Sequence, residues 1–266
     1  MLVTRIEILC MLTLLTDFGL TDIYVGVMKG IITQINPHIN VIDLTHQIPP
    51  QNIAAARFCL MNAYTYFPSG TVHLGVVDPG VGSTRRAIAV EFATGFLVGP
   101  DNGIFSGVLS QTPALSAVEL TNSDYWRVVR SSATFHGRDI FAPVAAHLAS
   151  GVSLDDLGGV IDVASLVKLE IPNSTVMDTS IQGCIQYIDG FGNSITNIPG
   201  DEIVGKQWAV IAGGVEIPGG RTYSEQPQGS AIALIGSHGW IEIAVNGGSA
   251  RSQLHLDYLD PVQVLF

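Results

Sequence analysis

The first part of the chain alternates short apolar runs with segments whose apolar residues recur at helical spacing. Short apolar runs bounded by turn residues are typical of buried strands, and a helical period is typical of amphipathic helices. Strands alternating with helices predict an α/β domain with a central, mostly parallel sheet flanked by helices. The expected strands are residues 12–16, 41–44, 71–77, 87–91, 96–99 and 117–120, and the expected helices are residues 23–35, 53–66 and 138–149.

The pattern changes after residue 172, where Pro172, Asn173 and Ser174 interrupt the apolar runs. Beyond them, short β-rich runs at 181–188, 208–212, 231–235 and 240–245 are separated by Gly, Pro and Asn turns. No strong helical pattern lies between these runs, which favours a smaller all-β barrel or sandwich. We therefore expect an N-terminal α/β domain (11–172), a linker (173–180), a C-terminal β domain (181–266) and an N-terminal extension (1–10).

Composition narrows the class of protein. A hydrophobic fraction of 47% with only 13% charged residues is typical of a folded globular protein. The formal charge of -11 and the absence of a basic patch argue against a nucleic-acid partner. No apolar run reaches the length of about 18 residues that a membrane span needs.

The cysteines and the N-terminus bear on location. Cys10, Cys59 and Cys184 are odd in number, far apart and without CxxC spacing, which favours a reducing, cytoplasmic compartment over a disulfide framework. The first ten residues contain a short apolar run without a small-residue cleavage site, so we expect no signal peptide.

Polar residues gather where the expected strands end. Ligands of open α/β sheets bind outside the carboxyl ends of the strands. The loops at these ends are TDFGLTD (16–22), VVDPGVGSTRR (76–86) and GPDNG (99–103), and TFHGRD (134–139) directly precedes a helix.

In the first of these loops, Asp17 directly follows a strand and Asp22 lies where a helix is expected to begin. A carboxylate at a strand end can accept both hydroxyls of a ribose, as in dinucleotide-binding folds. Asp22 could instead be an N-cap, since an Asp there accepts a backbone N–H of the first turn.

In the second loop, Gly80 and Gly82 allow a close approach of the backbone. Asp78 and Arg85 are near enough in sequence to form an ion pair across the loop, which could be purely structural. Arg86 is equally near, so the spacing does not choose between the two arginines.

His136 is followed by Gly137 at the start of a helix, as expected for a residue that points into a cleft, although a lone His is more often structural. Its neighbours Arg138 and Asp139 could simply pair with each other. The chain lacks GxxxxGK[ST], GxSxG and HExxH, and no GxGxxG follows the first strand. Nothing in the spacing of the acidic residues and His136 specifies a metal, so no metal site is expected.

In this order, the loops resemble those of the S-adenosylmethionine hydroxide adenosyltransferases, adenosine-forming hydrolases that are related to the fluorinase and the chlorinase. The resemblance runs from about residue 11 to the C-terminus. It rests on TDFGLTD, VVDPGVGSTRR, GPDNG, TFHGRDIFAP, IDGFGNSITN and GSHGWIEIAVNGG. It implies an α/β domain followed by a β-barrel-like domain, and hydrolysis of S-adenosyl-L-methionine by attack of water at the ribose 5′-carbon without a cofactor.

The resemblance also assigns residues. The family's water-activating Asp, Arg and His fall on Asp78, Arg85 and His136, so the resemblance chooses Arg85 over Arg86. Its nucleoside-binding Asp falls on Asp17, and its methionine-binding Asp, aromatic residue and Asn fall on the second domain. The full set expected to bind substrate is Asp17, Asp22, Asn102, Asp189, Phe191, Asn193, Ser237 and Asn246.

Departures from the related halogenases favour water as the nucleophile. The halogenases carry a Tyr where this chain has Asp78, and they lack the His that matches His136. The fluorinase has an extra loop where this chain has only residues 93–95. One departure, His238 in place of a halogenase Arg, bears on how the methionine carboxylate is bound.

Two other functions stay open at this point. The chain could be a halogenase of the same fold or a non-catalytic S-adenosylmethionine-binding module, although pure binding has no need of an acid–base set. The family assembles as a trimer, with substrate between the N-terminal domain of one subunit and the C-terminal domain of the next. We therefore expect a homotrimer.

Overall fold

The computed structural model describes residues 10–266 and divides into two compact units, which meet in sequence between Leu169 and Glu170. The expected extension at residues 1–10 lies outside the described residues except for Cys10. That residue is half-buried and packs against the hydrophobic core of the first unit.

The first unit is built on a seven-stranded sheet with the order β2-β1-β3-β5-β4-β6-β7. The first four strands of that order run parallel, whereas β4 and β7 run against their neighbours. The predicted mostly parallel α/β sheet is therefore confirmed. The strands are β1 (Met11–Thr16), β2 (Asn40–Thr45), β3 (Thr71–Val76), β4 (Ala87–Phe92), β5 (Gly95–Pro100), β6 (Ala114–Glu119) and β7 (Gly159–Val160).

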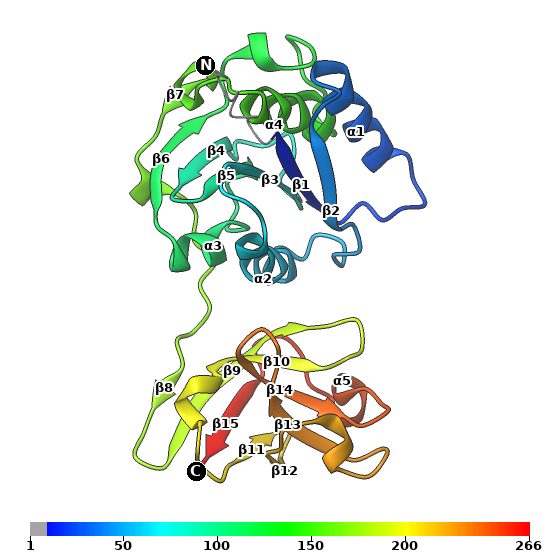
Figure 1. The fold of residues 1–266 in the computed structure, drawn as a ribbon, viewed down its shortest axis with the longest axis vertical. Coiled ribbons are helices and arrows are strands. Elements are labelled where there is room, and N and C mark those ends of the chain that lie inside the picture. The colour runs from blue at the N-terminus through cyan, green and yellow to red at the C-terminus, as the bar shows by residue number, and fades with distance from the viewer. Residues whose placement is uncertain (1–9) are drawn as a thin grey trace, which may run out of the picture. The chain divides into compact units, whose positions relative to one another are not determined.

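Helices cover both faces of this sheet, with α1 and α4 on one face and α2 and α3 on the other (Figure 1). Because the central strands are covered on both sides, β1 and β3 are buried along almost their whole length, without the alternation of a half-exposed strand. The helices are α1 (Tyr24–Ile35), α2 (Ile53–Ala63), α3 (Ser106–Gln111) and α4 (Ala142–Ala149), with short 3-10 turns at Tyr64–Tyr66, Ser123–Tyr125, Leu154–Leu157 and Val163–Ser165.

Two helix boundaries differ from the sequence prediction. The helix expected at 138–149 begins with a π-helical turn, Gly137–Phe141, and continues as α4. Asp22 is not an N-cap, because α1 begins at Tyr24 and its N-cap position, Ile23, offers no capping side chain. The six-residue helix α3 was not expected, because it is too short to show a period.

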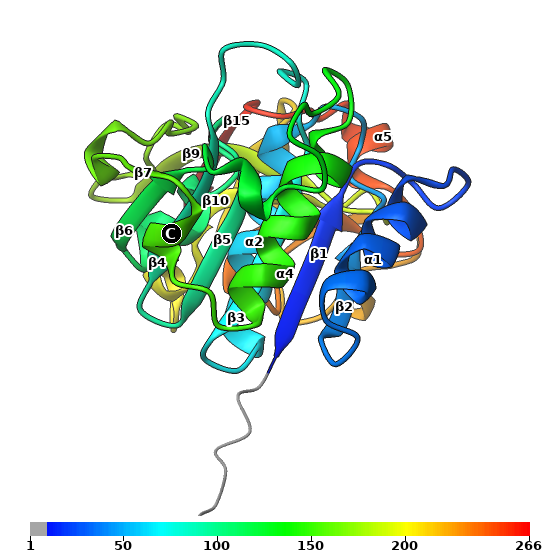
Figure 2. The ribbon, with the colours of Figure 1, turned by 90° about the horizontal axis from the view of Figure 1, so that it is seen from above.

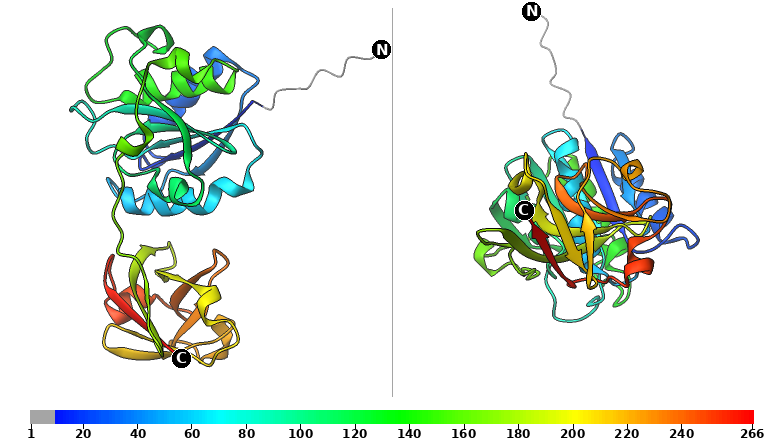
Figure 3. Two further views of the ribbon diagram at one scale, coloured as in Figure 1. Left: turned by 90° about the vertical axis from the view of Figure 1, so that its left-hand side faces the viewer. Right: turned by 90° about the horizontal axis from the view of Figure 1, so that it is seen from below.

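The second unit is one antiparallel sheet with the order β12-β11-β15-β9-β10-β14-β13, and β8 pairs with β9. A bridge between Gly219, after β12, and Ala233, in β13, brings the two ends of the order together, so the sheet curves into the predicted barrel-like form (Figure 3). The elements are β8 (Thr175–Val176), β9 (Ser180–Ile188), β10 (Ser194–Pro199), β11 (Ala209–Ala212), β12 (Val215–Pro218), β13 (Ala231–Ile235), β14 (Trp240–Val245), α5 (Ala250–Leu254) and β15 (Pro261–Leu265), with 3-10 turns at Gly200–Ile203 and Tyr223–Glu225.

The segment expected as a linker, residues 173–180, contains β8, which pairs with β9 at Thr175↔Gln182 and Val176↔Ile181. Ser180 is already the first residue of β9. A two-residue strand carries no readable alternation, so the sequence showed only the turn residues around it. The structure assigns the segment to the second unit.

The parallel strands of the first unit place their carboxyl ends at one edge of the sheet. In Figure 2, β1 points toward this edge, and loops of the first unit project beyond it. The segments after β1, β2, β3 and β5 begin here, and they include three of the four polar motifs.

Candidate active site

The loop between β3 and β4 carries an ion pair between Asp78 and Arg85. Arg85 Nε donates to Asp78 Oδ1 at 2.9 Å and Nη2 donates to Oδ2 at 2.5 Å. The Arg85 side chain is only 11% exposed, and the Asp78 side chain is only 6% exposed. A two-point contact between a planar guanidinium and a carboxylate fixes the orientation of both groups.

The same guanidinium reaches His136. Arg85 Nη2 lies 2.8 Å from His136 Nδ1, and because arginine only donates, Nδ1 accepts and the proton of the neutral ring lies on Nε2. Burial, and then the positive charge of Arg85, lower the pKa of His136 below its usual 6.5. The imidazole is therefore neutral near pH 7, and Asp78, Arg85 and His136 form one hydrogen-bonded set.

Close packing of two loops brings this set together. Gly82 has a φ of +76°, and a Cβ there would lie 2.3 Å from the carbonyl oxygen of Ala133. Only glycine combines that φ with so close an approach. The loop carrying Asp78 and Arg85 can thus lie directly against the segment that leads to His136.

A buried carboxylate, Asp139, holds the segment around His136. His136 immediately precedes the π-helical turn, in which Asp139 is fully buried. Asp139 accepts from Arg138 at 2.7 and 2.8 Å and from the Ser132 backbone at 2.9 Å. The hydrogen bond from Arg138 outweighs burial and lowers the pKa of Asp139 to about 2. The predicted Arg138–Asp139 pair is confirmed, and it also fastens the segment before His136.

Arg86 turns to a different set of partners. Its Nε and Nη2 donate to Asp101 Oδ2 at 2.9 and 2.5 Å, and its Nη1 donates to Ser165 Oγ at 2.9 Å. Arg86 therefore ties the loop after β5 to residues near 165. The structure brings Arg85, and not Arg86, to Asp78 and His136.

Asn102 is engaged with backbone. Its Nδ2 donates to Val77 O at 2.8 Å and its Oδ1 accepts from Ile104 N at 3.2 Å. Its amide therefore fastens the end of β5 to the residue before Asp78. In this structure Asn102 supports the loop of the ion pair.

Asp17 and Asp22 have different surroundings. Asp17 is half-buried, and its Oδ2 accepts from Gln51 N at 2.7 Å, which links the loop after β1 to the one after β2. Asp22 is exposed. Within residues 10–266, no hydrogen bond or ion pair holds Asp22 in place.

Three aromatic rings lie between these motifs, and the sequence reasoning missed them. Phe18, Tyr24 and Phe135 contact one another with ring centroids 5.3–5.9 Å apart. Each is a sequence neighbour of a candidate residue or of the expected start of a helix, which is the signal that could have identified them. They form an apolar surface next to His136 and Asp17 in the chain.

In the second unit, Asp189 organises the turn between β9 and β10. Its Oδ1 accepts from the backbones of Phe191 and Asn193, both at 2.9 Å, and its Oδ2 accepts from Asn193 Nδ2 at 3.1 Å. Gly192 adopts a φ of +82° within the turn. This leaves the Phe191 ring 81% exposed, whereas Asn193 is buried.

The remaining candidates lie in turns at the ends of β13 and β14. Ser237 is exposed in the turn between the two strands. Asn246, just after β14, donates from Nδ2 to Gln226 O at 2.8 Å. His238, next to Ser237, has its Nε2 3.2 Å from Glu242 Oε2.

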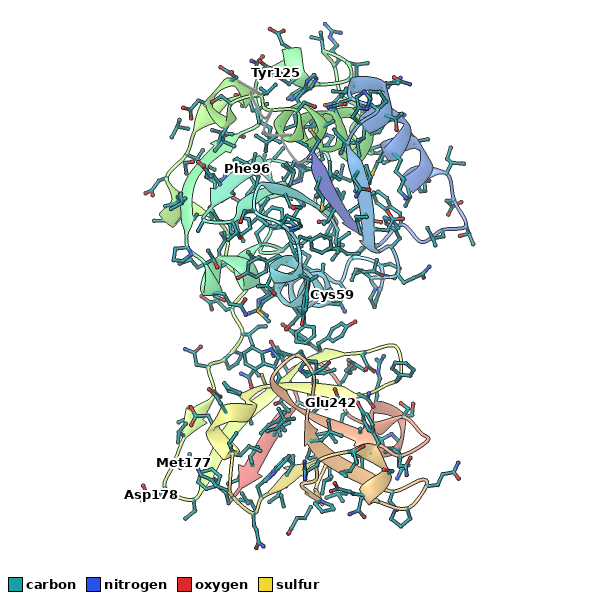
Figure 4. The ribbon with its side chains drawn as sticks, in the orientation of Figure 1. Cys59, Phe96, Tyr125, Met177, Asp178 and Glu242 are labelled. Atoms are coloured by element: carbon teal, nitrogen blue, oxygen red, sulfur yellow. The ribbon has the colours of Figure 1, made fainter. Side chains whose placement is uncertain are left out.

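Glu242 is a buried carboxylate that the sequence reasoning did not single out. It lies in β14 and is 4% exposed (Figure 4). Tyr223 OH donates to its Oε1 at 2.8 Å. Burial, and then the bond to Glu242, raise the pKa of Tyr223 to about 12. A lone Glu within the apolar run WIEIAV was the available signal.

Among residues 10–266, no three His, Cys, Asp or Glu side chains are grouped so that they could hold a metal ion. Within the same residues, no helix is long and apolar enough to cross a membrane.

Family models match both units. Residues 12–158 match the model of the SAM hydroxide adenosyltransferase N-terminal domain, and residues 183–263 match that of the C-terminal domain. The two matches follow the order of the units and together span most of the chain.

Individual proteins give the same result. The chain is 40% identical to the (R)-S-adenosyl-L-methionine hydrolase of Thermus thermophilus, over 94% of this chain and 98% of that protein. It is 26% identical to the fluorinase of Actinopolyspora mzabensis, over 88% of this chain and 90% of that protein. A solved structure of an uncharacterized conserved protein from Thermotoga maritima superposes with a TM-score of 0.89 at 35% identity, covering 96% of this chain and 100% of the other.

Proposed function

Because this chain belongs to the SAM hydroxide adenosyltransferase family, we propose that it hydrolyses S-adenosyl-L-methionine to adenosine and L-methionine. The observation that carries the proposal is the contiguous set of Asp78, Arg85 and His136 at the carboxyl edge of the parallel sheet. Greater identity to the hydrolase of Thermus thermophilus than to the fluorinase favours water over halide as the nucleophile.

The substrate carries its own leaving group. In S-adenosylmethionine the sulfur is a sulfonium, so the C5′–S bond breaks with its electron pair going to neutral methionine. A water oxygen forms the new C5′–O bond from the opposite side, and the proton lost by that water goes to solvent. Alignment of two reactants can lower a barrier by about 7–11 kcal/mol in favourable cases. The reaction therefore calls for positioning more than for a metal or covalent intermediate, and we propose that it uses no cofactor.

The acid–base set is proposed to activate the attacking water. Water has a pKa of about 15.7 and is a poor nucleophile. We propose that Asp78, Arg85 and His136 orient the attacking water and favour its hydroxide character. The positive charge of Arg85 stabilises negative charge on the oxygen, and the hydrogen bonds to His136 and to the Asp78 carboxylate hold that guanidinium in place.

We propose that the substrate is bound from both units. In the first unit, Asp17 accepts hydrogen bonds from the ribose hydroxyls, and Asp22 lies nearby in the chain. Asn102 contributes by supporting the Asp78 loop. In the second, methionine is bound by the turn of Asp189, Phe191 and Asn193, with Ser237 and Asn246 near the methionine and the adenine. A carboxylate offers about four lone-pair positions, and the turn uses three on Asp189, which leaves one for the substrate ammonium.

Assembly and location complete the proposal. We propose a homotrimer in which the first unit of one subunit and the second unit of the next bind the same substrate molecule. The support is the division of nucleoside and methionine residues between the units. The three cysteines, Cys10, Cys59 and Cys184, are odd in number, far apart in sequence and without CxxC spacing, which supports a cytoplasmic location. We propose no nucleic-acid or membrane partner, since the net charge is -11.

One experiment tests the reaction directly. The protein is incubated with S-adenosyl-L-methionine in ¹⁸O-water. The products are separated by chromatography, and their masses are measured by mass spectrometry. We expect adenosine and methionine, with the label in the 5′-hydroxyl of adenosine. Label in methionine, or methylthioadenosine as product, would overturn attack at C5′.

Two further arms separate the alternatives. With chloride added, a halogenase would form 5′-chloro-5′-deoxyadenosine at the expense of adenosine, and we expect no such product. A binding module would retain S-adenosylmethionine in equilibrium dialysis without consuming it, whereas we expect consumption to continue until the substrate is exhausted.

A further inference from the structure

Behind Asp17 lies a pair of buried polar side chains that the mechanism above does not use. Thr16, the last residue of β1, is fully buried, and its Oγ1 lies 2.8 Å from His46 Nδ1. The same Oγ1 accepts from Phe18 N at 3.2 Å. The two bonds of Thr16 therefore fix the backbone on both sides of Asp17.

His46 holds this loop a second time. Besides its side-chain bond to Thr16, its carbonyl oxygen accepts from Gly19 N at 2.8 Å. His46 follows β2 and is 4% exposed. The four residues from Thr16 to Gly19 are thus fastened at three points, and two of them belong to His46.

The ion pair of Asp43 and Lys29 determines which ring nitrogen of His46 carries the proton. His46 Nε2 lies 3.1 Å from Asp43 Oδ1, an electrostatic contact more than an aligned hydrogen bond. Lys29 Nζ lies 2.6 Å from the other oxygen of Asp43. Burial alone would raise the pKa of Asp43, but the contacts with Lys29 and His46 together outweigh it and lower the pKa. The carboxylate therefore stays ionised and draws the imidazole proton to Nε2, which leaves Nδ1 to accept from the Thr16 hydroxyl.

Within residues 10–266, one hydrogen bond orients the Asp17 side chain directly. Its carboxylate accepts one bond, from Gln51 N at 2.7 Å, and Gln51 has a φ of +65°, a strained backbone for a residue other than glycine. The direction in which the other oxygen points depends on the backbone of residues 16–19. That backbone is what Thr16 and His46 hold.

We propose that Thr16 and His46 are positioning residues for substrate binding, which aim the Asp17 carboxylate at the ribose hydroxyls. The proposal rests on the function proposed above for Asp17. Neither side chain touches substrate, because both are buried behind the loop. Their effect therefore appears in substrate affinity and passes through Asp17.

The chain contains a matched control for this bond. Thr13, in the same strand, is also fully buried, and its Oγ1 lies 2.8 Å from the buried His73 Nδ1. The two pairs have the same chemistry, length and burial. They differ in place, because the Thr13–His73 bond lies in the middle of β1 and β3 and contacts no candidate loop.

The test compares Thr16→Val with Thr13→Val. Each removes one buried hydroxyl at nearly constant volume, so we expect similar falls in Tm. Only Thr16→Val should raise KM, by about tenfold, which corresponds to about 1.4 kcal/mol of binding free energy, while its kcat stays within about twofold of wild type. Thr16→Ser restores the hydroxyl and should restore KM. Equal KM values for the two Val variants would overturn the proposal.

A second pair keeps the test valid if Thr16→Val does not fold. His46→Asn retains an oxygen near the position of Nδ1 and should keep KM near wild type. His46→Leu has a similar volume without an acceptor and should raise KM as Thr16→Val does. Equal KM values for His46→Asn and His46→Leu would overturn the proposal.

A double-mutant cycle separates this inference from the function on which it rests. If Thr16 acts through Asp17, Thr16→Val should raise KM no further in an Asp17→Ala background. A further rise of the same size would overturn the positioning role. If Asp17→Ala alone leaves KM unchanged, the proposed role of Asp17 fails instead, whatever Thr16 does.

Discussion

Arg85 and Arg86 are neighbours in sequence, yet they serve different parts of the first unit. Consecutive side chains of an extended segment point to opposite sides. One side faces Asp78 and His136, and the other faces Asp101 and Ser165. Both arginines are bound to carboxylates, so the presence of an ion pair does not separate them. The contact of Arg85 with an imidazole does.

Substitutions at the set should act on turnover. We expect Asp78→Ala, Arg85→Ala and His136→Ala each to lower kcat by about 10²–10⁴-fold while substrate binding stays largely intact. Because the three residues act as one unit on one water, the triple variant should be little slower than the slowest single variant. Rates of adenosine formation, with binding followed by calorimetry, measure both quantities.

Arg86→Ala is the internal control. It leaves the Asp101 carboxylate, 3% exposed in its ion pair, without its cation, so the variant should lose about 3 kcal/mol of stability or more. Turnover by the folded enzyme should stay near wild type. Abolished activity in Arg86→Ala with near-normal activity in Arg85→Ala would reverse the assignment.

The decline of activity at low pH should follow the protonation of His136. Its pKa is lowered below 6.5 by burial and by Arg85, so the ring is neutral at pH 7. As pH falls through that lowered pKa, Nδ1 gains a proton and faces the donors of Arg85, which breaks the contact. Activity and native-state stability should therefore both decline on the acid side, with a midpoint below about pH 6.5.

His136→Asn tests this origin. Its Oδ1 can still accept from Arg85 but does not titrate in this range, so kcat/KM should be low and should lose the acid limb seen in wild type. A pH profile with the same acid limb in both proteins would assign the limb to another group.

Side-chain contacts within one loop were predictable from the sequence, whereas contacts between distant segments were not. The Asp78–Arg85 pair was predictable because both residues lie in one short loop. The contact with His136 spans 51 positions, and no spacing rule foretells it. Thr16, His46, Glu242 and Tyr223 were missed for the same reason: each acquires its role from a partner on another element.

At the scale of elements, the loop after β3 depends on one glycine. Gly82→Ala would place a methyl group 2.3 Å from Ala133 O and strain a φ of +76°. The strain alone costs about 1–2 kcal/mol, and the clash pushes the Asp78 loop away from the His136 segment. We expect kcat to fall by about tenfold or more, since small displacements from a productive geometry are costly.

Gly70→Ala supplies the comparison for that variant. Gly70 has a φ of +88° in a turn, but a Cβ there would meet nothing within 4 Å. It should lose similar stability through backbone strain and keep its kcat. If the two variants have equal kcat, the close approach at Gly82 is not what assembles the set.

The elements were predictable where apolar runs mark them, whereas the more polar strand β10 was not expected although it is buried. Buried central strands such as β1 and β3 were expected within a residue or two of their bounds, because continuous apolar runs mark them. The helix α3 and the strand β8 each span less than two periods of their own pattern and were not expected. The π-helical turn Gly137–Phe141 was expected as ordinary helix, because side-chain period does not distinguish one wider turn.

At the scale of the molecule, the candidate residues fall into two groups that follow the two units. Asp17, Asp78, Arg85 and His136 belong to the first unit, and Asp189 and Asn193 belong to the second. The change of pattern near residue 172 lies close to the boundary between the units at Leu169 and Glu170, and it separates helix-bearing from helix-poor sequence. Which copies of the two units act together is a property of the assembly, and no pattern within one chain encodes it.

Our proposed homotrimer makes a measurable claim about which chains share a site. A subunit with Asp78→Ala keeps its methionine residues, and a subunit with Asp189→Ala keeps its acid–base set, so each variant alone should be inactive. If a site takes its first unit from one subunit and its second from the next, co-expression at equal levels should make about one junction in four fully wild type. We therefore expect about a quarter of wild-type activity from the mixture.

Co-expression of Asp78→Ala with Arg85→Ala is the control and should give no activity, because both substitutions lie on the same side of every junction. Sedimentation should give the mass of three chains throughout, and mixed trimers that remain inactive would mean that each site is built within a single chain.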